Sequence, residues 1–356
     1  MRDFVKRLPL YGKLFPVLVS AMLAGAQTAK AEDKKLWDEV VSDANRPSAI
    51  TTGSDGNYVI HISEPEHLAW YAWKLGNEVN PTELSKYSHA ELYFDKDLDM
   101  SAYRWRGIGE KIEEKYDFAG IIDGQGHTIS NLVMDGDNGD KYSGFLDEIE
   151  HPVEIRNIRF YKAKSSVKQY AGILAGEIYH TSNVLLSNLT FEECSVSISG
   201  DYSAGIVVGC IDTSTGIVFD NIVIRKCEFL GKGEEYGGIT GCIDWGDCSV
   251  KVRNSFISVR PGSSLSHAPR RTGAIVGLMD HASTLEVDNC VLDLASKFFN
   301  YNQQGAIVGK WEGTSKPKVS HTLVISDYAS QPLPNTTYEE MGLFAGYASS
   351  SSKMEL

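Results

Sequence analysis

A five-residue phrase with glycine at both ends recurs through the last two-thirds of the chain. Its copies begin at Gly172, Gly205, Gly237, Gly273, Gly305 and Gly342, so the successive steps are 33, 32, 36, 32 and 37 residues. A regular period of this size is typical of a solenoid, in which each repeat forms one coil and contacts its neighbours. Any fold assigned to this chain has to accommodate that period.

A second phrase keeps the same register. It begins at Asn157, Asn188, Asn221, Asn254, Asn289 and His321. The distance from the first glycine of a block to the following phrase is 16 residues at four blocks and 17 at Gly237. The return distance varies from 15 to 21 residues. One part of each coil is therefore held at constant length, while the other part tolerates insertions.

The repeats favour strands over helices. Each contains short runs of Ile, Val, Phe and Thr that are broken by Gly, Asn, Asp and Ser, which is the pattern of strands and turns. Stacked strands lie about 4.8 Å apart. The sequence predicts an all-β fold, a parallel β-helix of about seven coils in residues 136–348, followed by a short tail at 349–356.

The first 31 residues resemble a secretory signal peptide, with four basic residues, an apolar stretch at 14–26, and Ala29-Lys-Ala31 as a cleavage site. We expect an exported protein (secreted, periplasmic or on the cell surface) that is cleaved after Ala31. Residues 1–31 hold five basic residues and one acid, so the remaining chain would carry 29 basic and 46 acidic residues, a net charge of −17. This charge disfavours nucleic acid as a partner, and no apolar segment is long enough for a membrane span.

Residues 32–62 are predicted to be a weakly patterned lead-in, and residues 63–135 a cap with the first coil. Ser63 and Glu66 have the spacing of a capping box. Leu68, Tyr71, Ala72 and Leu75 would form the apolar face of a helix that ends near Gly76. An open solenoid end exposes strand edges, so this helix is the expected N-terminal cap. An uncapped last coil would allow self-association.

Three segments resemble the GLUG-motif family of right-handed parallel β-helix proteins, which are exported by bacteria. They are Asp95–Ser101, Trp105-Arg-Gly-Ile-Gly109, and Phe118-Ala-Gly-Ile-Ile-Asp-Gly-Gln-Gly-His-Thr-Ile-Ser-Asn-Leu132. The resemblance covers roughly residues 58–348. It implies a right-handed helix that serves as a surface or secreted module, often adhesive and without assigned chemistry.

Four acids follow successive glycine blocks at one fixed position: Asp212, Asp244, Asp280 and Glu312. In register, they would form a column of carboxylates about 4.8 Å apart. Such a column needs solvent, a raised pKa or a bound cation, so Ca²⁺ is a candidate ligand. The simpler interpretation, which we favour, is that each acid begins a turn and caps the local backbone.

Two further groups are candidate binding residues. Trp245 and Trp311 flank the acidic column and could provide a platform for sugars, although aromatic packing within the coil explains them as well. Arg260, Arg270 and Arg271 form a basic cluster at a long insertion, suited to carboxylate-bearing ligands or simply to a solvated loop.

Six cysteines in an exported chain raise the possibility of disulfides. Cys210 and Cys242 occupy equivalent positions in successive repeats, and so do Cys194 and Cys227. Either pair could be bonded. We favour a ladder of buried thiols, because a long solenoid needs few covalent links.

These observations favour an adhesin-like, non-catalytic module that binds a glycan or protein ligand. A carbohydrate-active lyase or hydrolase that uses the four acids is the alternative, since fold alone does not settle chemistry. A structural spacer is the third possibility.

Overall fold

The structure is a computed structural model, and it describes residues 35–109, 117–136, 141–265, 270–294, 303–326, 341–342 and 345–348. The chain divides into two compact units, residues 1–34 and 35–356. All described residues belong to the second unit. The predicted signal peptide and the tail at 349–356 lie outside the described residues.

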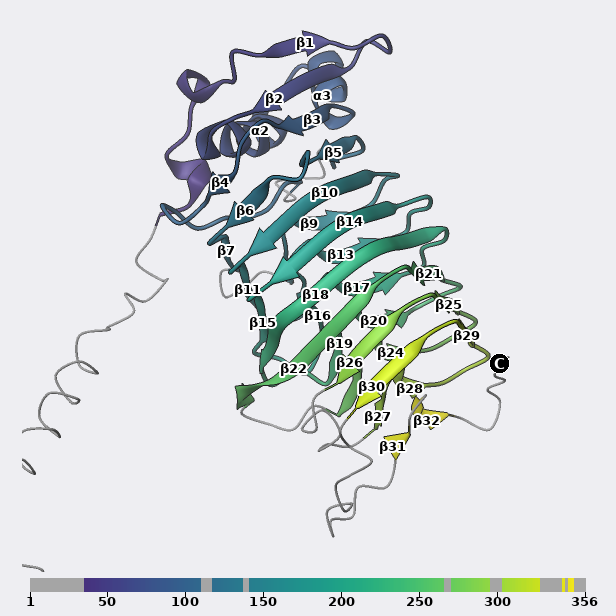
Figure 1. Ribbon diagram of the computed structural model, residues 1–356. Helices are drawn as coiled ribbons and strands as arrows, with labels where there is room; N and C mark the ends of the chain where they lie inside the picture. Colours follow the sequence, from purple (N-terminus) through teal and green to yellow (C-terminus); the bar gives the residue numbers. More distant parts are fainter. Residues whose placement is uncertain are drawn as a thin grey trace, which may run out of the picture. The chain divides into compact units, whose positions relative to one another are not determined.

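The second unit is a parallel β-solenoid of about seven turns, as predicted (Figure 1). Its strands form three sheets, and every pairing between named strands is parallel except that of β1 with β2. Sheet 1 contains β1 (Ile50–Thr52), β2 (Tyr58–Ile62), β3 (Glu91–Phe94), β4 (Leu98–Asp99), β5 (Ile121–Asp123), β6 (Thr128–Ser130), β7 (Val133–Asp135), β10 (Glu154–Tyr161), β11 (Lys164–Val167), β14 (Leu185–Glu192), β15 (Ser195–Ile198), β18 (Ile217–Gly231), β21 (Ser249–Arg253), β22 (Phe256–Leu265), β25 (Thr284–Asp288), β26 (Val291–Leu294), β29 (Lys316–Ser320) and β30 (Leu323–Ser326).

The other two sheets have seven strands each. Sheet 2 contains β8 (Tyr142–Ser143), β12 (Tyr170–Ala171), β16 (Ser203–Gly205), β19 (Glu235–Gly237), β23 (Arg271–Gly273), β27 (Gln304–Gly305) and β31 (Met341–Gly342). Sheet 3 contains β9 (Leu146–Ile149), β13 (Ala175–Tyr179), β17 (Val208–Asp212), β20 (Thr240–Asp244), β24 (Val276–Met279), β28 (Val308–Trp311) and β32 (Ala345–Ala348). Each coil therefore passes through sheet 2, sheet 3 and sheet 1 in turn.

The glycine blocks form the corner between sheets 2 and 3. At the first glycine of a block, a β-carbon would meet the carbonyl oxygen three residues later, at 2.0 Å for Gly205 and Val208. At the second glycine, a β-carbon would meet the neighbouring coil, at 2.4 Å for Gly209 and the oxygen of Gly176. The backbone is packed too closely there for any side chain, which explains the repeated phrase.

The asparagine phrase forms a second corner, within sheet 1. All six first residues of the phrase have a positive φ, between 46° and 59°. Asparagine tolerates this left-handed conformation better than most residues. Its side chain also bonds to the preceding coil: Asn188 Nδ2 donates to Asn157 Oδ1 at 3.0 Å, and Asn221 Nδ2 to Asn188 Oδ1 at 2.8 Å. Asparagine thus serves both the turn and the stacking.

The N-terminal region differs from the prediction in its details. The predicted helix is α2 (Pro65–Asn77), but its N-cap is Glu64 and no side chain caps it, so the predicted capping box is absent. The Ser63 side chain instead contacts His67 Nδ1 at 3.2 Å. A second helix, α3 (Pro81–Ser88), was not predicted, although Asn80 caps its Thr82 N–H.

These two helices lie in the chain between β2 and β3, the first two parallel rungs of sheet 1. Sheet 1 therefore begins inside the predicted lead-in, which also contains two short 3₁₀ helices, Trp37–Glu39 and Asp43–Asn45. Trp37 and Leu68 are buried in the same core as the coils. No helix among the described residues is long and apolar enough to cross a membrane.

Candidate functional site

The four predicted acids lie in register on successive coils. Asp212 and Asp244 are directly paired between β17 and β20. Asp280 follows Met279, which pairs with Ile243, and Glu312 follows Trp311, which pairs with Met279. The acidic column predicted from the sequence is therefore present at the end of sheet 3.

Each acid is followed by a residue in the left-handed conformation. These residues are Thr213 (φ 43°), Trp245 (φ 61°), His281 (φ 63°) and Gly313 (φ 63°). The aspartates hold these turns: Asp244 Oδ1 accepts the N–H of Trp245 at 2.8 Å, and Asp280 Oδ1 accepts that of His281 at 2.6 Å. The favoured interpretation, that the acids begin turns, agrees with these bonds for Asp244 and Asp280.

Trp245 is the unusual member of these four left-handed residues. A bulky side chain at positive φ is rare, and the left-handed conformation costs about 1–2 kcal/mol outside glycine. The turn is fixed from the preceding coil as well, since Thr213 Oγ1 donates to the Trp245 carbonyl oxygen at 2.8 Å. The Trp245 side chain is nevertheless 66% exposed. A strained backbone here presents a large aromatic surface to solvent, which is the kind of observation that suggests function.

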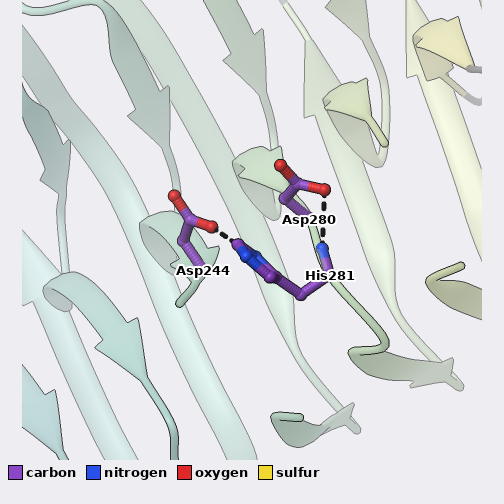
Figure 2. A group of neighbouring side chains, drawn as sticks. All are labelled: Asp244, Asp280 and His281. Carbon is purple, nitrogen blue, oxygen red and sulfur yellow. Dashed lines mark hydrogen bonds and ion pairs between the residues drawn. The ribbon is translucent and has the colours of Figure 1, made fainter. Parts of the chain in front are cut away.

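Asp244, Asp280 and His281 lie together at this part of the acidic column (Figure 2). His281 Nδ1 lies 2.8 Å from Asp244 Oδ1. The His281 ring is roughly parallel to the Trp245 ring, with centroids 6.4 Å apart. Burial raises the pKa of the Asp244 carboxyl, an effect that the neighbouring Asp280 increases and His281 opposes. Glu312 is paired with Lys310 at 2.7 Å.

Asp244, Asp280 and His281 each offer one ligand atom, and these atoms all lie within 4.8 Å of one another. Two of these carboxylates already have partners, because Asp244 contacts His281 Nδ1 and Asp280 accepts the N–H of His281. Calcium prefers six to eight oxygen ligands, and three residues of which one is histidine fit that preference poorly.

The other predicted tryptophan belongs to the core. Trp311 is 3% exposed and its Nε1 donates to the Ser315 carbonyl oxygen at 3.0 Å. It precedes the acid of its coil, in register with Met279 and Ile243, whereas Trp245 follows the acid of its own coil. The prediction that Trp311 contributes to a binding surface is wrong, because that position faces the interior.

Two of the three predicted arginines are engaged in ion pairs with the acids of the preceding coil. Arg271 contacts Glu235, and both are largely buried. Arg270 lies 3.5 Å from Glu234. The Arg260 side chain lies outside the described residues. The basic cluster is therefore in large part neutralised, so a carboxylate-binding role for Arg271 is wrong.

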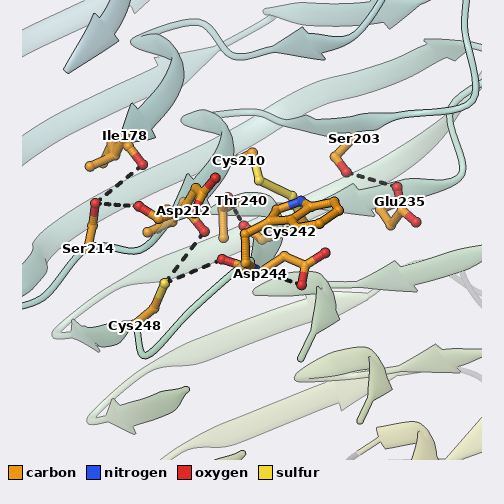
Figure 3. Close-up of a disulfide and its surroundings, with 12 residues drawn as sticks. Ile178, Ser203, Cys210, Asp212, Ser214, Glu235, Thr240, Cys242, Asp244 and Cys248 are labelled. Atoms are coloured by element: carbon orange, nitrogen blue, oxygen red, sulfur yellow. Dashed lines mark hydrogen bonds between the residues drawn. A yellow bond between two sulfur atoms is a disulfide. The ribbon is translucent and has the colours of Figure 1, made fainter. Parts of the chain in front are cut away.

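A further column of buried side chains lies between sheets 2 and 3, and the sequence singled out only its cysteines (Figure 3). Cys210 and Cys242 are paired in register and form a disulfide, with Cα atoms 4.7 Å apart. The favoured ladder of thiols is therefore wrong for this pair. Cys194 and Cys227 are free and buried, as expected for the ladder, and so are Cys248 and Cys290.

Glu177 and Glu148 continue the cysteine column toward the N-terminus. Glu177 is only 4% exposed. Its burial, together with the charge of Glu148, raises the pKa of its carboxyl to about 8, even though Tyr142 bonds to it. In the sequence this glutamate has the spacing of an exposed strand position, so no signal identified it.

No protein-family model matches the chain, so the resemblance to the GLUG-motif family stays a prediction. A segment of 147 residues is 28% identical to halomucin of Haloquadratum walsbyi, covering 40% of this chain and 2% of that protein. A crystal structure from Bacteroides ovatus, provisionally described as an immunoglobulin A1 protease, is similar with a TM-score of 0.49 and 17% identity, over 84% of this chain and 86% of that one. The solenoid assignment rests on the strand register of the chain itself.

Proposed function

We propose that this protein is an exported, non-catalytic module that binds a glycan at the turn surface around Trp245. The observation that carries the proposal is the exposed Trp245 ring, held in a left-handed turn beside His281, Asp244 and Asp280. An exposed aromatic face stacks on the apolar face of a sugar ring, and neighbouring carboxylates accept hydrogen bonds from its hydroxyls.

Two features support export. The predicted signal peptide is one. The other is the disulfide Cys210–Cys242, because disulfides persist in oxidising compartments outside the cytosol. The proposal also includes a role at the cell surface and membership of the GLUG-motif family. A protein ligand in place of the glycan is its alternative.

The bonds of the acidic column argue for binding rather than catalysis. Glycoside hydrolysis needs one carboxyl that donates a proton and a second that acts as a base or nucleophile. Here Asp244 binds His281, and Glu312 binds Lys310. The enzymatic alternative predicts cleavage products, which binding alone does not generate.

The test is a glycan array with the mature protein, with and without calcium, followed by product analysis of every polysaccharide that binds. Binding without cleavage supports the proposal, and calcium dependence would support a cation at Asp244 and Asp280. Trp245→Ala should weaken binding at least about tenfold, whereas Tyr202→Ala, which removes another exposed aromatic ring (37% exposed) next to β16, should leave it unchanged. Cleavage products would overturn the proposal in favour of the enzyme.

A further inference from the structure

A groove on the outer surface of sheet 1 begins around the corner from Trp245. It has a volume of about 580 Å³ and is lined by four successive coils, from β18, β21, β25 and β29. Trp245 directly follows β20 of sheet 3, and Ser249, four residues later, lies at the wall of the groove. The groove and the tryptophan platform thus adjoin along the chain.

Two in-register columns of side chains line the groove. The first has Gly216 at one end, then Ser249, Thr284 and Lys316. The second contains Val218, Lys251, Glu286 and Lys318. Apolar residues such as Val218, Leu285 and Pro317 also line the groove, and two lysines lie at the end toward β29.

The charge of the groove is opposite to that of the chain. Lys251 pairs with Glu286 at 3.0 Å. Lys316 and Lys318 are exposed, and within the described residues neither has an ion pair. They stand two residues apart on one strand, so both point to the same side. The groove therefore carries two unneutralised positive charges on a chain whose formal net charge is −13.

On the side of Trp245, Asp247 is exposed two residues before Ser249. On the other side the acids are engaged: Asp220 binds Arg253 at 2.9 Å, and Asp288 accepts a hydrogen bond from Ser320 at 2.7 Å. His321 also lies 2.9 Å from Asp288. These contacts leave the two lysines as the charges best placed to meet a ligand that lies along the groove.

We infer that this groove binds an acidic glycan, a linear chain whose sugars carry carboxylate or sulfate groups. Lys316 and Lys318 meet the acidic groups as point charges, which suits either anion, while Ser249 and Thr284 provide hydroxyls for sugar oxygens. The inference rests on the proposed function, since it names the class of glycan that continues from the Trp245 platform into the groove.

The test measures affinity for polygalacturonate and for its fully methyl-esterified form, which has the same backbone without the charge. Dextran sulfate and dextran form the corresponding pair for sulfate. We expect the charged member of at least one pair to bind about tenfold more tightly, and Lys316→Gln with Lys318→Gln to remove that preference. Lys164→Gln with Lys168→Gln, which removes the same charge from two exposed lysines in and just after β11, should preserve it.

The outcomes separate this inference from the proposed function. Equal binding of charged and neutral polymers, still lost in Trp245→Ala, would overturn the acidic-glycan inference and leave the platform intact. Charge-dependent binding that needs the two lysines but not Trp245 would support the groove and overturn the platform. Equal affinity for single-stranded oligo-dT would show a general polyanion site, and would contradict a glycan ligand.

Discussion

Glu177 gives the sharpest prediction for stability. Its carboxyl is buried between sheets 2 and 3, and the charged groups that face it are acidic: Glu148 and Glu150 from the preceding coil and Asp212 from the following one. Tyr142 is the neighbour that bonds to it. Ionising this group in the folded protein is therefore unfavourable, because neither water nor a cation compensates the charge.

The magnitude follows from the pKa. The carboxyl has a pKa of about 8 in the folded protein against a reference value of 4.5. Each pKa unit corresponds to about 1.4 kcal/mol. Below pH 4.5 the group is neutral in both states and costs nothing. Between pH 4.5 and 8 only the unfolded chain ionises, so stability falls as the pH rises, by about 3 kcal/mol at pH 7 and about 5 kcal/mol above pH 8.

We therefore expect Glu177→Gln to unfold at higher urea concentration than the wild type above pH 6, and at nearly the same concentration at pH 4.5. Glutamine keeps an acceptor for Tyr142 but cannot ionise. Glu228→Gln is the matched control, because Glu228 is an exposed glutamate of β18, and its effect should stay within about 0.5 kcal/mol. A Glu177→Gln effect that does not change with pH, or that destabilises throughout, would refute the reasoning.

Three further predictions concern the residues that join or shape the coils. Gly209→Ala should destabilise the fold by about 3 kcal/mol because its β-carbon would overlap a backbone oxygen, whereas Gly76→Ala, with open space in α2, should be neutral or stabilising in the same urea titration. Replacing Cys210 and Cys242 by alanine should lower the free energy of unfolding by about 3–4 kcal/mol; denatured wild-type protein should take up four alkyl groups before reduction and six after, and six before reduction would contradict the disulfide. Asn188→Ala should cost about 1 kcal/mol more than Asn188→Gly by calorimetry, since both lose the bonds to neighbouring coils but only alanine is strained at positive φ; equal losses would show that the conformation contributes nothing.

The periodic part of the fold was predictable because each repeated phrase has one local physical cause. Gly209 stands where the backbone of the preceding coil excludes a side chain, and Asn188 stands where a left-handed turn also needs a side-chain bond. Both requirements recur at every coil, so they leave the same residue at the same spacing. The position of Asp244 beside Asp280 followed from that register.

The parts that were missed depend on contacts that the period does not encode. Trp245 follows the acid of its coil and Trp311 precedes the acid of its own, and this difference of two positions exchanges the turn for the core. Glu177 is buried because sheet 2 faces sheet 3, an arrangement that strand alternation does not reveal. The helix α3 did have a local signal, in Asn80 followed by Pro81, and could have been predicted.

The central claim, that a glycan binds on the exposed ring of Trp245, is tested most directly by calorimetric titration of the polysaccharide that binds best into wild-type and Trp245→Ala protein. The account predicts that the variant binds at least about tenfold more weakly, since stacking on an aromatic ring contributes about 1.5 kcal/mol or more. It also predicts that the urea midpoint of unfolding is not lowered, because the substitution removes no contact in the core. Equal affinity of the two proteins would contradict the account.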